Sequence, residues 1–228
     1  MKVAEIYRSV QGEGLLTGTE SVFVRTSGCN LRCWFCDTPF TSWSPEGEDL
    51  SVDEILEQVD AFACEHVVIT GGEPMLHAEL VPLARALRER GLHITIETAG
   101  TLDLPVACDL MSLSPKLQGS GPPLEKHPRW HQRHERSRHR PEVIRRLMAD
   151  YEYQLKFVVD APEDCVAIQA WLAEFPAAEQ SRVWLMPQGI TMEELAQRAR
   201  WLEPQCALHG WRFCPRRHIE WFGLARGT

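Results

Sequence analysis

Short runs of β-branched and apolar residues alternate along this chain with longer segments in which apolar residues recur every three or four positions. The first pattern is typical of buried strands in a parallel sheet, and the second of amphipathic helices. Their alternation predicts an α/β fold, a partial (βα)6 parallel barrel. The expected strands are residues 21–26, 66–70, 93–98, 110–113, 154–159 and 182–185, and the expected helices are residues 52–64, 78–90, 141–150, 165–175 and 192–203.

Unusual residues that packing alone would not require follow nearly every expected strand. They are Gly-Cys at 28–29, Gly-Gly-Glu-Pro at 71–74, Glu-Thr-Ala-Gly at 97–100, Ser-Pro-Lys at 114–116 and Met-Pro-Gln-Gly at 186–189. Because the carboxyl ends of parallel strands meet at one edge of the sheet, we expect these motifs to converge on one ligand site. A barrel of six strands would leave a lateral opening for a substrate.

The composition restricts the class of protein. With 228 residues, 44% of them hydrophobic and 25% charged, the chain is expected to form a single globular domain over residues 1–228. There is no run of about 18 apolar residues and no secretory signal, so a cytoplasmic location without membrane contact is expected. The net charge of −8 argues against a broad nucleic-acid surface.

One basic segment departs from this acidic composition. Residues 129–146 contain seven arginines and three histidines and follow the linker-like residues 118–128. A nucleic-acid patch is one interpretation. The favoured one is a solvated loop followed by a helix over residues 141–150, so that residues 118–150 form an insertion-like segment.

Three closely spaced cysteines, Cys29, Cys33 and Cys36, offer a metal site. Three thiolates can hold an iron-sulfur cluster and leave one iron without a protein ligand. A structural zinc ion would need a fourth nearby ligand, and Cys64 and His66 lack a matching spacing. The cluster is therefore the favoured interpretation, and a non-enzymatic zinc or RNA-interaction module is the alternative.

The spacing Cys-x3-Cys-x2-Cys, with Phe35 before the last cysteine and Gly-Gly-Glu-Pro at 71–74, resembles the radical S-adenosylmethionine (SAM) enzymes. The resemblance implies a 4Fe-4S cluster on the three cysteines and SAM on its open iron. One electron then splits SAM to a 5′-deoxyadenosyl radical, which is cofactor chemistry.

Further motifs resemble one family of that class, the 7-carboxy-7-deazaguanine synthases of the queuosine pathway. They are Gln-Gly-Glu-Gly at 11–14, Phe-Val-Arg-Thr-x-Gly-Cys-Asn-Leu-x-Cys-x-Phe-Cys-Asp-Thr at 23–38, and the motifs at 70–74, 97–100 and 114–116. The resemblance implies conversion of 6-carboxy-5,6,7,8-tetrahydropterin to 7-carboxy-7-deazaguanine with loss of ammonia, SAM being regenerated.

The resemblance also implies roles for individual residues. Thr38 is expected to bind Mg²⁺. The residues expected at the substrate are Val10, Gln11, Gly12, Glu13, Arg25, Thr70 and His218. Those expected at SAM are Phe35, Cys36, Asp37, Gly72, Glu73, Ser114, Pro115 and Lys116, while Glu97 and Gln188 could bond a sugar or base edge.

The expected partners are the small pterin substrate and an external, flavodoxin-like one-electron donor, with nucleic acid disfavoured and a homodimer left open. A second enzymatic interpretation stays open as well. A small activase that installs a glycyl radical on a partner protein would share the cysteine motif and Gly-Gly-Glu-Pro. It would not need the Gln-Gly-Glu-Gly motif, Arg25 or Thr38.

Overall fold

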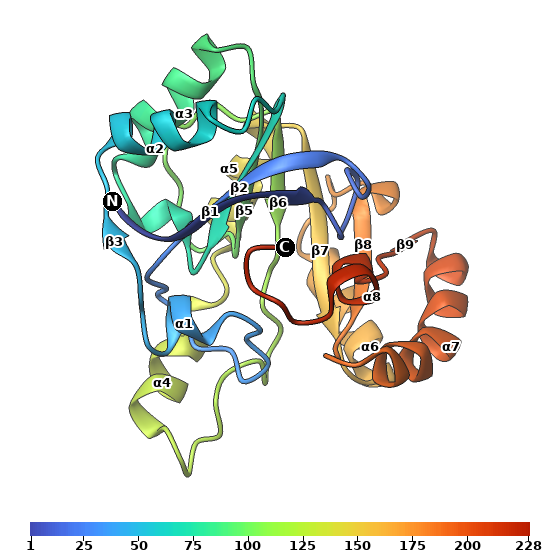
Figure 1. Cartoon of the computed structure of the whole chain (residues 1–228). Helices are drawn as coiled ribbons and strands as arrows, with labels where there is room; N and C mark the ends of the chain where they lie inside the picture. The colour runs from blue at the N-terminus through green and yellow to red at the C-terminus, as the bar shows by residue number, and fades with distance from the viewer.

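The structure is a computed structural model that describes residues 1–228. A nine-stranded sheet forms its centre (Figure 1). The strands are ordered β3-β1-β2-β4-β5-β6-β7-β8-β9. Their bounds are β1 Lys2–Val10, β2 Glu20–Thr26, β3 Glu48–Asp49, β4 His66–Gly71, β5 His93–Thr98, β6 Leu110–Leu113, β7 Tyr153–Val159, β8 Val183–Pro187 and β9 Arg212–Phe213.

Along the part of the sheet ordered β2-β4-β5-β6-β7-β8-β9, each strand pairs in parallel with the next. The six strands expected from the sequence are among them, which confirms the predicted α/β fold. β1 pairs antiparallel with β2 on one side and β3 on the other. Because β3 and β9 end the sheet without pairing to each other, the barrel stays open.

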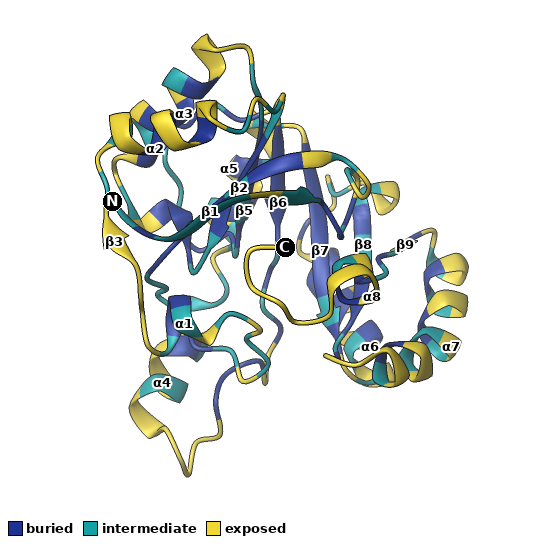
Figure 2. Ribbon diagram, in the orientation of Figure 1, coloured by how far each residue is buried: buried dark blue, intermediate teal, exposed yellow.

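Helices cover the outer side of the sheet (Figure 2). Helix α2 begins with a capping box between Ser51 and Glu54, and α7 with one between Thr191 and Glu194. The bounds are α1 Pro39–Ser42, α2 Val52–Asp60, α3 Leu80–Glu89, α4 Pro128–Ser137, α5 Pro141–Asp150, α6 Pro162–Ala173, α7 Met192–His209 and α8 Arg217–Phe222, with short 3-10 turns at Pro74–Leu76 and Gln180–Arg182. No helix is long and apolar enough to cross a membrane.

The strands separate an apolar layer from a polar one. Leu155 and Phe157 of β7 are fully buried in the core between sheet and helices. Lys156, between them, points to the other side, because successive side chains of a strand alternate. This alternation gives the open side of the sheet a polar lining.

Three local expectations were wrong or incomplete. Residues 128–137 form helix α4 and not a loop. His134 is its one buried residue, so the charged neighbours hide the helical pattern in the sequence. Helix α7 continues past Pro204 to His209, held by buried Leu202 and Cys206 on either side. Strand β1 was not expected at all.

Candidate active site

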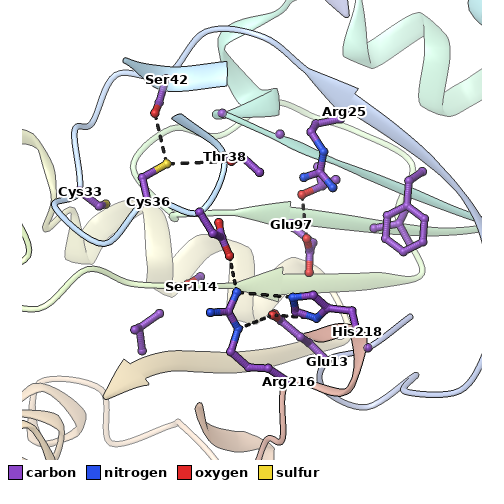
Figure 3. Close-up of a pocket in the computed structure, with 18 of the residues that line it drawn as sticks. Glu13, Arg25, Cys33, Cys36, Thr38, Ser42, Glu97, Ser114, Arg216 and His218 are labelled. Carbon is purple, nitrogen blue, oxygen red and sulfur yellow. Dashed lines mark hydrogen bonds and ion pairs between the residues drawn. The ribbon is translucent and has the colours of Figure 1, made fainter. Parts of the chain in front are cut away.

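A cavity of about 330 Å³ lies at the carboxyl edge of the parallel strands (Figure 3). Every parallel strand from β2 to β8 places residues on its wall, either at the strand's end or in the following loop. The loop after β1, helix α8 and residues 223–228 complete the lining. The expected convergence of the motifs at one edge is therefore seen.

The three cysteines lie in the loop over residues 27–38, which we call the cluster loop, and all three line this cavity. Burial, with the nearby Glu73 carboxylate, raises the pKa of Cys29 to about 11. Burial raises that of Cys33 to about 12 although Lys116 opposes it. Burial therefore disfavours the thiolate form of Cys29 and Cys33, and a bound metal would offset this effect.

The donor set suits a cluster and not a single ion. No three His, Cys, Asp or Glu side chains lie close enough together to hold one metal ion. A tetrahedral zinc would need its ligands gathered within about 2.3 Å of one point. The three cavity-lining sulfurs would instead suit a larger metal-sulfur unit that needs no fourth protein ligand.

Hydrogen bonds from side chains to backbone carbonyl oxygens hold the cluster loop in shape. The Arg32 guanidinium donates to the carbonyl oxygens of Cys29 and Leu31, each at 2.7 Å. The Trp43 indole donates to the carbonyl oxygen of Cys33 at 3.3 Å. These side chains hold the backbone of the loop that carries the three cysteines.

The Gly-Gly-Glu-Pro turn after β4 packs directly on the cluster loop. A Cβ at Gly72 would lie 2.0 Å from the carbonyl oxygen of Gly28, so only glycine fits. Glu73 is fully buried and accepts hydrogen bonds from Thr98 Oγ1 at 2.7 Å and the Ala99 N–H at 2.9 Å. It does not line the cavity, and its expected role at SAM stays a prediction.

Polar side chains that include Glu13, Thr70, Glu97 and Lys156 line one part of the cavity, which we call the polar wall. Lys156 lies at its centre. Its Nζ donates to Glu13 Oε2 at 2.7 Å and to Glu97 Oε1 at 2.9 Å, and Glu97 Oε2 accepts from Thr70 Oγ1 at 2.7 Å. Burial opposes its charge, but the two carboxylates raise the pKa of Lys156. In return Lys156 lowers the pKa of Glu13, against the effect of burial. Both groups are charged.

Arg216 links the cluster loop to the polar wall. Its guanidinium donates to the Asp37 carboxylate, to Glu13 Oε1 at 3.4 Å and to the Gly189 carbonyl oxygen at 2.7 Å. Although burial disfavours the charge, Asp37 and Glu13 raise the pKa of Arg216. Figure 3 shows Arg216, Glu13 and His218 together on one side of the cavity.

His218 packs on the Gln-Gly-Glu-Gly segment. A Cβ at Gly12 would lie 2.5 Å from the backbone nitrogen of His218, and the Arg217 N–H donates to the Gly12 carbonyl oxygen at 3.0 Å. Burial lowers the pKa of His218 although Glu13, 3.6 Å away, opposes the shift. The imidazole is therefore a neutral group on the cavity wall near pH 7.

Arg25 is aimed by residues of β1. Its Nε donates to Glu5 Oε1 and one terminal nitrogen to the Tyr7 hydroxyl, each at 2.7 Å. Tyr7 in turn stacks on Phe23, with ring centroids 5.2 Å apart. The remaining N–H groups of Arg25 stay available toward the cavity.

The residues expected at SAM border two neighbouring cavities. Lys116 Nζ donates to the carbonyl oxygen of Ser114 at 2.6 Å and to its hydroxyl at 2.7 Å, and both residues line the cavity. Pro115 faces a neighbouring cavity beside Trp34. Cys36 Sγ lies 3.2 Å from Ser42 Oγ and 3.9 Å from Thr38 Oγ1.

Of the expected site residues, all but Glu73 and Pro115 line the one cavity. Sequence reasoning missed Lys156, although a lone lysine in the apolar run Tyr-Gln-Leu-Lys-Phe-Val-Val was a usable signal. It also missed Arg216, for which no local signal exists. The tail over residues 223–228 was unassigned, and it closes one side of the cavity through Arg226, whose guanidinium lies 3.7 Å from the Phe40 ring centroid.

An open parallel sheet with three cysteines beside its carboxyl edge defines a radical SAM protein, and residues 23–150 match the family model of the Radical SAM superfamily. The chain is 47% identical to the 7-carboxy-7-deazaguanine synthase of Rhodopirellula baltica over 99% of this chain and 88% of the relative. It is 44% identical to that of Halobacterium salinarum, over 100% and 93%. The crystal structure of QueE from Escherichia coli superposes with a TM-score of 0.70 at 25% identity, over 94% of this chain and 92% of that one.

The chain belongs to the 7-carboxy-7-deazaguanine synthase family of the radical SAM superfamily. This confirms the resemblance stated from the motifs. Membership implies a 4Fe-4S cluster and SAM as cofactors, which the three cavity-lining sulfurs fit.

Proposed function

We propose that this chain converts 6-carboxy-5,6,7,8-tetrahydropterin to 7-carboxy-7-deazaguanine with release of ammonia. One observation carries the proposal: a single cavity holds the three cysteines at one end and a fixed set of charged and amide groups at the other. The relatives' printed names state the product and favour this reaction over glycyl-radical activation.

The bound cluster and SAM supply a carbon-centred radical by one-electron cleavage of the sulfonium. The chain's own residues bind and orient the substrate. The guanidinium of Arg25, held from behind by Glu5, offers its free N–H groups to the substrate carboxylate. Glu13 and Glu97 present carboxylate oxygens to the N–H edge of the heterocycle, at positions fixed by Lys156.

Gln11 and Thr70 line the same half of the cavity and have side-chain partners that hold them. The Gln11 amide donates to Ser21 Oγ at 2.8 Å, which leaves its carbonyl oxygen for a ligand. The surrounding wall excludes bulk water from the radical and keeps the rearranging ring in one orientation.

We propose that Mg²⁺ binds beside Thr38. Its hydroxyl lines the cavity next to Cys36, whereas the adjacent Asp37 carboxylate is engaged by Arg216. With one side-chain oxygen on the protein, the ion would take its other ligands from the substrate and water, as Mg²⁺ commonly does. A flavodoxin-like donor, a cytoplasmic location and a homodimer stay predictions.

The test is turnover by anaerobically reconstituted protein with dithionite, SAM, Mg²⁺ and 6-carboxytetrahydropterin. We expect a deazapurine product and ammonia in equal amounts, with SAM recovered. Cys33→Ala should abolish turnover, and Cys64→Ala, a half-buried cysteine outside the cavity, should not. Thr38→Ala should weaken mainly the Mg²⁺ dependence, measured against Thr38→Ser.

Two other results would contradict the proposal. The activase would be supported if the protein forms no deazapurine but consumes SAM when a protein substrate is added. A colourless protein that binds one zinc ion and no iron would support the zinc module.

A further inference from the structure

The hydroxyl of Ser42 lies against the sulfur of one of the three cysteines. Ser42 is the last residue of helix α1, and its Oγ lies 3.2 Å from Cys36 Sγ, a contact drawn in Figure 3. The residue is 3% exposed, and this sulfur is the hydrogen-bond partner that the structure gives its hydroxyl. Because water has little access there, the hydroxyl depends on the sulfur for its hydrogen bond.

The direction of this hydrogen bond follows from the chemistry of a bound cluster. A cysteine binds iron as a thiolate, which carries no proton and can only accept a hydrogen bond. With a cluster in place, the Ser42 hydroxyl is therefore the donor and Cys36 Sγ the acceptor. A hydrogen bond to a charged acceptor is stronger than one between neutral groups, and burial strengthens it further.

Helix α1 is fixed to the cluster loop near both ends of that loop. At the start of the loop, the Gly28 N–H donates to the Thr41 carbonyl oxygen at 2.8 Å. At its end, the Thr38 carbonyl oxygen accepts from the Thr41 N–H and from the Thr41 hydroxyl, each at 2.9 Å. The position of Ser42 is therefore set by α1 and not by the sulfur that its hydroxyl contacts.

The hydrogen-bond donors near the cluster sulfurs differ in kind. Cys29 Sγ accepts from the Leu31 backbone N–H at 3.4 Å, a bond within the loop itself. Thr38 Oγ1 lies 3.9 Å from Cys36 Sγ, which is farther than the Ser42 hydroxyl. Ser42 is thus the side chain that holds a donor closest to a cluster sulfur, and substitution can remove this donor without touching the backbone.

We propose that Ser42 raises the reduction potential of the cluster by donating a hydrogen bond to Cys36 Sγ. Reduction adds one electron to the cluster, supplied by an external reductant, and no bond is made or broken. The added negative charge is shared with the sulfur ligands. The hydroxyl therefore stabilises the reduced cluster more than the oxidised one. This role requires the cluster that family membership implies, whatever the identity of the substrate.

Direct contact with a bound ligand is the other role that the position of Ser42 allows, since the residue lines the cavity. Two observations favour the role at the cluster. The 3% exposure leaves little of the side chain for a ligand to touch, and the 3.2 Å distance to Cys36 Sγ already engages the hydroxyl.

The first test is a redox titration of the anaerobically reconstituted protein without SAM or Mg²⁺. Dithionite is the reductant, and EPR of the reduced cluster is the readout. In Ser42→Ala the equilibrium constant for reduction should fall about tenfold, which lowers the midpoint potential by about 59 mV for one electron. Ser42→Thr keeps the hydroxyl and should restore most of the parent potential. Iron and sulfide per chain should match the parent in both variants.

The matched control is Thr41→Val, which removes another buried hydroxyl from α1. That hydroxyl donates to the Thr38 carbonyl oxygen and not to a sulfur, so the variant should keep the parent potential. An equal shift in Thr41→Val would show that a loosened helix lowers the potential, and it would overturn the proposal. An unchanged potential in Ser42→Ala would overturn it as well.

The second test separates the cluster from its ligands. The Kd for SAM at the oxidised cluster, measured by equilibrium dialysis, should be the same in Ser42→Ala as in the parent. A weaker affinity for SAM with an unchanged potential would assign Ser42 to SAM binding and overturn the proposal. Product formation from the pterin by the parent protein is a separate measurement. Its failure would refute the proposed function and leave the measured potentials standing.

Discussion

The ammonium group of Lys156 on β7 donates a 2.7 Å hydrogen bond to the Glu13 carboxylate, which lies in the loop after β1. Both side chains are screened from water by the surrounding wall, and each keeps the other charged. The ion pair connects the loop after β1 to β7 across the polar side of the sheet.

Removing the lysine charge should therefore destabilise the fold. Lys156→Met leaves Glu97 without its cation and Glu13 with Arg216 alone, and we expect a loss of about 3–5 kcal/mol in the free energy of unfolding. Urea titration of the anaerobically reconstituted protein measures this, with the exposed Lys126→Met as control. A loss below about 1 kcal/mol would show that the pair is solvated.

Substitution of Arg216 should affect catalysis more than cluster assembly. Arg216→Ala removes the link between Asp37 on the cluster loop and Glu13 on the polar wall. We expect kcat/KM to fall by about a hundredfold because the reacting groups are then misplaced. Arg216→Lys should recover little, because an ammonium lacks the planar fork. Iron content should stay at the parent level, and its loss would assign Arg216 to cluster binding.

Gly72 should prove intolerant of any side chain. The Cβ of Gly72→Ala would meet the Gly28 carbonyl oxygen at 2.0 Å and displace the cluster loop. We expect iron and sulfide per chain to fall well below those of the parent after reconstitution. Gly91→Ala is the control, since a Cβ there meets nothing within 4 Å and its positive φ costs only about 1–2 kcal/mol. Equal cluster content in both variants would refute the packing argument.

His134 should make stability depend on pH. Burial lowers its pKa from 6.5 to about 4, an effect that Arg138 and Lys116 reinforce and Glu135 opposes. Above pH 6.5 this imidazole is neutral in both states. Between pH 6.5 and 4 the unfolded chain binds a proton that the folded chain does not, so stability falls as the pH falls, by up to about 1.4 kcal/mol per pH unit.

The variant His134→Gln isolates this contribution. An amide can accept from the Arg32 N–H and donate to Ser120 without titrating. The slope of unfolding free energy against pH between 5 and 6.5 should be smaller in the variant than in the parent. Equal slopes in parent and His134→Gln would show that His134 titrates normally.

The fold was largely predictable because its central strands are buried on both faces. Val67, Val68 and Ile69 form an uninterrupted apolar run, which identifies β4 without reference to any other segment. Strand β1 gave no such signal. Its Glu5 and Tyr7 face the cavity and bond Arg25, so the polar positions of that strand are the functional ones.

The cluster half of the site was predictable because its residues are close in sequence. The close spacing of Cys29, Cys33 and Cys36 in the sequence indicates that they lie together in one loop. The turn at 71–74 directly follows a strand that the sequence predicts. Arg216 could not be found in this way, since its partner Glu13 lies 203 residues earlier. Glu73, expected at SAM, does not line the cavity and accepts hydrogen bonds from Thr98 and Ala99 at the end of β5. The roles of the individual site residues stay predictions.

That separation along the chain has a consequence for biosynthesis. The sulfurs and the turn beside them come from the first third of the polypeptide, so this part can assemble from neighbouring segments early in synthesis. The opposite wall of the cavity can form only after Arg216 and Arg217 have been synthesised. Arg216 bonds Glu13, and the Arg217 N–H donates to the Gly12 carbonyl oxygen. A nascent or C-terminally shortened chain that ends before α8 would thus hold a metal-binding loop without a complete chamber to contain the radical.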